Sequence, residues 1–229
     1  MPLKGLSGKR IREHLRKYSP VYIIGIVIML LLSDILYTST RPQTPDDQQV
    51  LVYLVDTYAQ ADLLDDLCAD ALQYGSETDD LLLEVEAQSI SYNEEDYTSA
   101  MVLMARMSVG DGDAYITNST ALDSMAANGV CLPLDEWVEA GWLEDLGVEP
   151  WYYTETDDST GEETTYVAAL KLTGVENLWK DGIVTSDEMY LVIAANGSNV
   201  GTTKDVVGYM LKSIAEGTYA SAASEEPAA

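Results

Sequence analysis

The chain has 229 residues, and its 39 Asp and Glu far outnumber its 12 Lys and Arg, for a formal charge of −27 at pH 7. Six of the cations precede residue 18, so residues 41–229 hold six cations and 37 acids, a formal charge of −31. Such a surface repels phosphate, which excludes a general nucleic-acid binder, and it argues against a domain that lies flat on an anionic membrane.

The first 37 residues carry the pattern of a membrane anchor. Residues 1–17 are basic, and the run VYIIGIVIMLLLSDILY at residues 21–37 is almost wholly apolar up to Leu32. A helix over residues 18–37, rising about 1.5 Å per residue, just crosses a hydrocarbon core. We therefore predict a single-pass transmembrane helix in the lipid bilayer of the cell membrane. The positive charge holds residues 1–17 in the cytoplasm, and the rest of the chain is extracytoplasmic.

A cleaved signal peptide is the alternative to a retained anchor. Cleavage needs a small-x-small site after the apolar run, and the sequence there offers no A-x-A triplet, so the anchor is favoured. The polar, proline-bearing residues 38–47 predict a linker, and residues 48–216 an extracytoplasmic domain. Residues 217–229 are small and polar, which predicts a disordered tail.

Hydrophobic periodicity predicts strands and helices in alternation through the first half of the domain. The predicted strands are 49–55, 81–89 and 113–117, and the predicted helices are 61–74, 94–107 and 121–127. We expect the first helix to end near Gly75. We expect one face of the second helix to lie against the core, and its residues are Tyr97, Ala100, Met101, Met104 and Met107. Three strand–helix units in series imply parallel strands with right-handed crossovers.

The second half of the domain mixes a hairpin with a late strand and helix. The predicted elements are a helix over 135–142, strands over 151–156 and 164–172 around the turn DDSTGEE, a strand over 189–194 and a helix over 203–215. The fold class is α/β, an open and mainly parallel sheet with flanking helices. Cys68 and Cys131 are the two cysteines, and the sequence leaves open two buried thiols or a disulfide.

Two stretches resemble extracellular solute-binding proteins of the type 2 periplasmic-binding fold. The first contains Asp113-Ala-Tyr-Ile-Thr-Asn, a short helix and Gly129-Val-Cys-Leu-Pro-Leu-Asp135. The second contains Leu191-Val-Ile-Ala-Ala-Asn-Gly-Ser and then Lys204-Asp-Val-Val-Gly-Tyr-Met-Leu-Lys. The resemblance implies a membrane-tethered, bacterial, solute-binding-like domain. Because such proteins are normally longer and close two lobes around a ligand, this domain is expected to be a single lobe plus a hairpin.

Ligands of an open parallel sheet bind beyond the carboxyl ends of its strands. Three polar loops follow the predicted strands there, and their candidate ligand-binding residues are Asp56, Thr57, Tyr58, Ser89, Ser91, Tyr92, Asn118, Ser119 and Thr120. Tyrosine rings stack on small ligands, and the helix N-termini that follow favour anions. The alternative is that these residues are helix caps and turn residues without a ligand.

The residues outside the anchor lack the usual groups of an enzyme site. The single histidine, His14, lies in the basic N-terminal segment, so the domain has no imidazole for a nucleophile or for zinc. We predict no catalytic residue, no metal site and no cofactor, and keep an acid-based hydrolase as a remote third hypothesis. Asp111-Gly112-Asp113 hints at calcium but does not continue as an EF-hand, which favours a solvated turn.

The leading prediction is a non-catalytic domain that binds a small solute or docks on a membrane partner such as a transporter permease. The alternative is a structural or interaction module of an envelope protein assembly, with no small ligand. That alternative predicts an exposed apolar patch, for which the first residues to consider are Trp137, Trp142, Trp151 and Trp179.

Overall fold

The computed structural model describes residues 18, 22, 25–26, 28–30, 32–33, 44–55, 61–92, 96–156, 159–184 and 186–218. The chain divides into two compact units, Met1–Gln43 and Thr44–Ala229. Residues 1–17, much of the predicted anchor and residues 219–229 lie outside the described residues, as do Asp56, Thr57 and Tyr58. Within the part of the chain that the structure describes, none of the helices has both the length and the apolar content needed to cross a bilayer.

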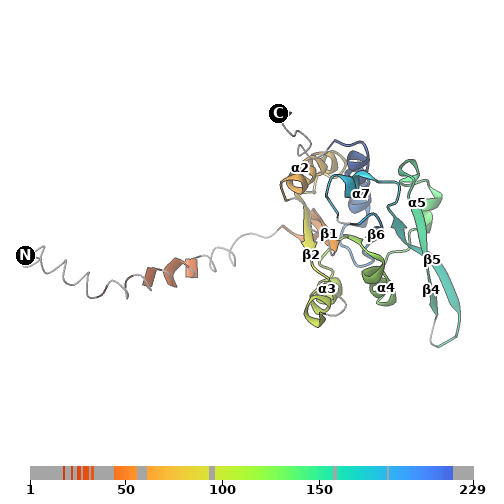
Figure 1. The fold of residues 1–229 in the computed structure, drawn as a ribbon, viewed down its shortest axis with the longest axis horizontal. Coiled ribbons are helices and arrows are strands. Elements are labelled where there is room, and N and C mark those ends of the chain that lie inside the picture. Colours follow the sequence, from red (N-terminus) through yellow and green to blue (C-terminus); the bar gives the residue numbers. More distant parts are fainter. Residues whose placement is uncertain are drawn as a thin grey trace, which may run out of the picture. The chain divides into compact units, whose positions relative to one another are not determined.

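The second unit is built on one sheet with the strand order β2-β1-β3-β6-β5-β4 (Figure 1). The strands are β1 (Gln49–Val55), β2 (Glu84–Ile90), β3 (Ala114–Thr117), β4 (Glu149–Thr156), β5 (Glu163–Lys171) and β6 (Tyr190–Ile193). β1 pairs in parallel with β2 and β3, as the series of strand–helix units predicts. The next three pairings, β3 with β6, β6 with β5 and β5 with β4, are antiparallel.

The open α/β sheet is therefore confirmed, but the prediction that it is mainly parallel is wrong. The error comes from β6, which returns beside β3 in the opposite direction. All four residues of β6 are buried. A short apolar run of this kind indicates a buried strand, but nothing in its pattern tells which way the strand runs.

Helices cover both faces of the sheet (Figure 1). They are α2 (Ala61–Thr78), α3 (Tyr97–Val109), α4 (Ser119–Ala127), α5 (Asp135–Glu139), α6 (Asn177–Lys180) and α7 (Val200–Ala215), with the 3-10 turns η1 (Asp46–Gln48) and η2 (Glu144–Leu146). One core lies between the sheet and α2 and α7, and the other lies under α3 and α4. β1 serves both cores, because Val52 points to the first and Tyr53 to the second.

The helix predicted to end near Gly75 continues to Thr78. Gly75 is buried where α2 meets α7, and a Cβ atom built on it would lie 2.4 Å from Leu82 Cδ2 and 2.9 Å from Val206 Cγ2. The glycine therefore allows the close packing of Leu82 and Val206 against α2 and does not terminate the helix. A sequence alone does not distinguish these two uses of glycine inside a helical pattern.

The predicted inward face of α3 is confirmed only at Met107, which is 3% exposed and fills the core together with Leu103, 1% exposed. The prediction is wrong for Tyr97, Met101 and Met104, which are 77%, 48% and 40% exposed. Apolar side chains occupy most of the circumference of this helix, so the 3.6-residue period does not single out one face. The result is an apolar surface on α3 that faces solvent.

The two cysteines are free, buried thiols that lie on opposite faces of the sheet. Cys68 belongs to the core under α2 and α7, and Cys131 to the core under α3 and α4. Burial raises the pKa of Cys68 to about 11 and that of Cys131 to about 12. Both sulfurs therefore remain protonated at neutral pH, which makes them poor nucleophiles.

Candidate functional site

The third predicted loop follows β3 at the carboxyl edge of its parallel strands. Asn118 is the N-cap of α4, and its side-chain oxygen accepts a hydrogen bond from the Ala121 amide at 2.9 Å. Ser119 is exposed in the first turn of α4, and Thr120 is half-buried beside it. The capping role of Asn118 is thus present, and binding of a ligand by these three residues stays a prediction.

The second predicted loop lies at the same edge but two strands away. Ser89 is an exposed residue of β2, paired alongside Leu54 of β1, and Ser91 is exposed just after the strand. Tyr92 is partly buried against the core under α3. Since neighbouring strands lie about 4.8 Å apart, β2 lies roughly 10 Å from β3 within the sheet. The first loop, Asp56 to Tyr58, lies outside the described residues.

A row of aromatic side chains, which the sequence analysis missed, begins beside the third loop. Tyr190 of β6 pairs with Thr117, the residue before Asn118. From Tyr190 the ring of Trp151 lies 6.5 Å away, that of Tyr153 lies 6.1 Å beyond Trp151, and that of Tyr166 lies 6.2 Å beyond Tyr153. We call these four residues the aromatic row.

Strand geometry explains why the aromatic row forms. Trp151 and Tyr153 are two residues apart on β4, and Tyr166 of β5 is paired directly opposite Tyr153, so all three point to one face. Tyr190 is 5% exposed, whereas Trp151, Tyr153 and Tyr166 are only partly buried. The local signal in the sequence is the run of three aromatic residues, Trp151-Tyr152-Tyr153, in a predicted strand: side chains alternate along a strand, so the first and third share a face.

An ion pair stands at the Tyr190 end of the aromatic row. Lys171 Nζ lies 2.8 Å from Glu188 Oε1, and the Tyr190 hydroxyl donates to the same oxygen at 3.1 Å. The hydrogen bond from Lys171 lowers the pKa of Glu188, and the same bond raises the pKa of Lys171. Both groups therefore stay charged over a wide pH range. As a pair they have no net charge, and they place polar oxygen and nitrogen atoms at this end of the aromatic row.

Two hollows lie at the opposite edge of the sheet, near the first residues of β1 and β3. The first, of about 260 Å³, is lined by Met104, Met107, Ser108, Asn128, Gly129, Val130 and Asn196. The second, of about 240 Å³, is lined by Asp46, Gln49, Leu51, Val109, Gly110, Asp111, Gly112, Asp113 and Ser198. None of the predicted site residues that the structure describes lines either hollow.

Asp113 is not part of a solvated turn, contrary to the sequence prediction. It is 6% exposed, and its Oδ2 accepts a hydrogen bond from the Leu51 amide at 2.9 Å. Asp111 instead forms an ion pair with Arg106 at 3.0 Å. Among the described residues, no three His, Cys, Asp or Glu gather closely enough to hold a metal ion. The segment therefore joins β1 to β3 by hydrogen bonds.

Asp113→Asn is expected to change how stability depends on pH. Burial raises the pKa of Asp113 above its unfolded value, so the folded state binds the proton more tightly and the carboxylate destabilises the domain at neutral pH. This destabilisation disappears as the pH falls through the folded pKa. The unfolding free energy of the wild type, relative to the variant, should therefore rise between pH 7 and pH 4 in urea titrations. A fall over that interval would contradict the assignment.

In comparisons with known proteins, the chain shows only a partial structural similarity to solved structures. No protein-family model matches the chain, and no curated protein matches it. The ABC substrate-binding protein Lmo0181 from Listeria monocytogenes, in complex with cycloalternan, is 18% identical with a TM-score of 0.26. That match covers 40% of this chain and 21% of that one.

A second solved structure matches to a similar extent. The N-glycan transport solute binding protein NgtS from Streptococcus pneumoniae, in complex with Man5GlcNAc, is 19% identical with a TM-score of 0.27, covering 43% of this chain and 19% of that one. The chain thus spans about a fifth of the length of either structure. Both partial matches are solute- or substrate-binding proteins, but TM-scores this low say nothing about a shared site.

Proposed function

We propose that the unit Thr44–Ala229 is a non-catalytic domain that binds a neutral carbohydrate at the aromatic row. The observation that carries the proposal is the row itself, with Trp151, Tyr153 and Tyr166 partly buried on one face of β4 and β5. Aromatic ring faces carry partial negative charge and attract the slightly positive C–H groups on the flat side of a sugar ring. Binding sites of this kind combine aromatic surface with a few fixed polar groups.

The charges around the aromatic row support a neutral ligand. Lys171 and Glu188 neutralise each other while leaving oxygen and nitrogen atoms for hydroxyl groups. An anionic ligand is repelled by the negative electrostatic potential of the strongly acidic domain. The face of the Tyr190 ring, which could attract a cationic ligand, already has Lys171 Nζ 5.8 Å from its centre. A neutral, hydroxyl-bearing ring fits these conditions best.

A screen of thermal unfolding with neutral oligosaccharides tests the proposal. Cycloalternan and Man5GlcNAc, named for the two partially similar proteins, are the first compounds. A ligand at 100 times its dissociation constant stabilises the folded state by about 2.7 kcal/mol. Open-chain polyols with the same number of hydroxyl groups serve as controls, since they lack the flat ring face. If no oligosaccharide raises the unfolding temperature above its polyol control, the proposal fails.

For the location, we infer that residues 18–37 anchor the chain in the lipid bilayer, with residues 1–17 in the cytoplasm and the domain outside. The basic segment followed by an apolar run supports this orientation. There the domain would collect solute and present it to a transporter permease. Protease added to intact cells should then digest the domain and spare the N-terminal residues. A domain that stays intact until the cells are lysed would refute this location.

A second candidate function, an interaction module of an envelope assembly, is favoured by the exposed apolar surface of α3. The tryptophans do not supply such a patch together. Trp137 and Trp142 are partly buried against each other at 5.0 Å, and Trp179 is 43% exposed elsewhere. The apolar surface of α3 is independent of the aromatic row, and both functions are compatible in one domain.

A further inference from the structure

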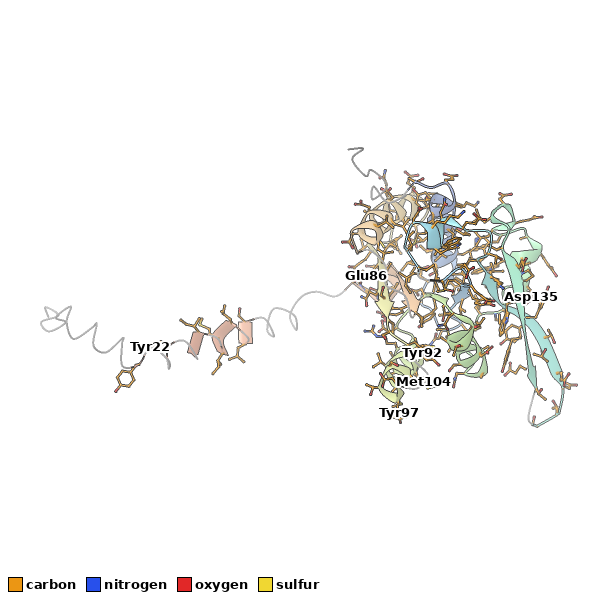
Figure 2. The ribbon with its side chains drawn as sticks, viewed as in Figure 1. Tyr22, Glu86, Tyr92, Tyr97, Met104 and Asp135 are labelled. Atoms are coloured by element: carbon orange, nitrogen blue, oxygen red, sulfur yellow. The ribbon has the colours of Figure 1, made fainter. Side chains whose placement is uncertain are left out.

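One side of α3 presents an apolar stripe to solvent. Tyr97, Met101 and Met104 follow one another at spacings of four and three residues, which places them on one side of the helix. We call these three residues the α3 stripe. Their exposed fractions, 77%, 48% and 40%, are high for large apolar side chains. Figure 2 labels Tyr97 and Met104 on α3.

The α3 stripe leads into the first hollow, because Met104 belongs to both. Besides Met104, the hollow is lined by Met107 at the end of α3 and by Asn128 and Val130 after α4. We call the stripe and the hollow together the groove; Met101, Met104 and Met107 all belong to it. Methionine adapts its shape to a partner more readily than branched side chains do, and methionine-rich surfaces are common where a helix is bound.

The electrostatics of the groove favour a cationic partner. Helix α3 contains no Asp or Glu, and its one charged residue, Arg106, is engaged by Asp111 and by the Tyr53 hydroxyl. The C-terminal ends of both α3 and α4 meet at the hollow, and helix C-termini carry partial negative charge. The whole domain adds its long-range negative potential.

We propose that this groove binds a basic amphipathic helix of a partner protein. Apolar side chains of that helix lie along the α3 stripe, one of them enters the hollow, and its Lys and Arg side chains face the helix C-termini and the acidic surface. A second copy of this chain is disfavoured as the occupant, because residues 41–229 carry a formal charge of −31 and two copies repel each other. An anionic lipid surface is disfavoured for the same reason.

Synthetic peptides test the proposal on the unit Thr44–Ala229, which is compact and has its own core. The probe is an 18-residue peptide with leucine on one face of the helix and lysine on the other. The first control has the same composition in an order without an apolar face, and the second replaces every lysine by glutamate. In fluorescence anisotropy we expect the probe to bind at least tenfold more tightly than the first control. The second should show no binding, since its charge is reversed.

Met104→Ser and Val102→Ser form a matched pair on the same helix. Val102 is 46% exposed, close to the 40% of Met104, but it does not line the hollow. We expect Met104→Ser to weaken binding of the probe peptide about tenfold and Val102→Ser to leave its affinity unchanged. Equal binding of the probe and its scrambled control, or equal effects of the two substitutions, would overturn the proposal. A dimer of the domain in sedimentation experiments would also overturn it, if Met104→Ser converts that dimer to monomers.

Carbohydrate-induced stabilisation should be the same in both variants, which keeps this test separate from that of the aromatic row.

Discussion

Replacing Gly174 by Ala is expected to destabilise the domain by about 3 kcal/mol or more. Gly174 lies between β5 and α6, where the backbone of η2 passes directly over it. A Cβ atom on Gly174 would lie 1.8 Å from the Leu146 carbonyl oxygen and 2.8 Å from the carbonyl carbon of Gly147. Since both contacts are to backbone, no change of rotamer relieves them, and the segments must separate.

Gly201→Ala is the matched control for this substitution. Gly201 is the second residue of α7, and no atom lies within 4 Å of a Cβ built there. Alanine at such a position restricts the unfolded chain and stabilises a protein by about 0.4–1 kcal/mol. Urea unfolding of the two variants should therefore give shifts of opposite sign. Similar shifts would mean that η2 does not lie against Gly174.

Trp151→Ala is expected to weaken carbohydrate binding at least about 30-fold, which corresponds to roughly 2 kcal/mol. Trp151 lies between Tyr190 and Tyr153, with ring centres 6.5 Å and 6.1 Å away, so its loss divides the aromatic row. Tyrosine and tryptophan at the centre of a contact surface contribute most of the affinity in many complexes. Calorimetric titration with an oligosaccharide that raises the unfolding temperature provides the measurement.

Tyr152→Ala controls for damage to the strand. Tyr152 is the next residue of β4, is 59% exposed and points to the opposite face of the hairpin. Both substitutions remove an aromatic side chain from the same edge strand, but only Trp151→Ala alters the aromatic row. We expect Tyr152→Ala to bind the oligosaccharide like the wild type. If both variants lose affinity equally, the effect arises from strand pairing, and the row is not the site.

The sequence predicts best those elements whose signal is local. The strand over 49–55 has the predicted bounds, because an apolar run rich in β-forming residues stands there between polar segments. Both strands around the turn DDSTGEE also lie within two residues of their predicted bounds, since turn residues fix a hairpin. The direction of β6 and the exposure of Tyr97, Met101 and Met104 on α3 could not be predicted, because each depends on neighbours far away in the chain.

The candidate site shows the same division between local and distant information. The carboxyl edge of the parallel strands follows from topology, and Asn118 and Ser119 follow β3 at that edge, whereas their binding of a ligand stays a prediction. The aromatic row requires the register in which Tyr166 faces Tyr153 and the packing of Tyr190 beside Trp151. No periodicity in the sequence encodes those pairings. The burial of Asp113 likewise depends on β1, 62 residues earlier.

The placement of the two cysteines has a practical consequence. Both sulfurs are enclosed, and the sheet stands between them. Maleimide reagents, which need an accessible thiolate, should leave the native chain unmodified. A single cysteine introduced on the outer surface can then carry a fluorophore or spin label without removal of Cys68 or Cys131, so spectroscopic distances can be measured on an otherwise native protein.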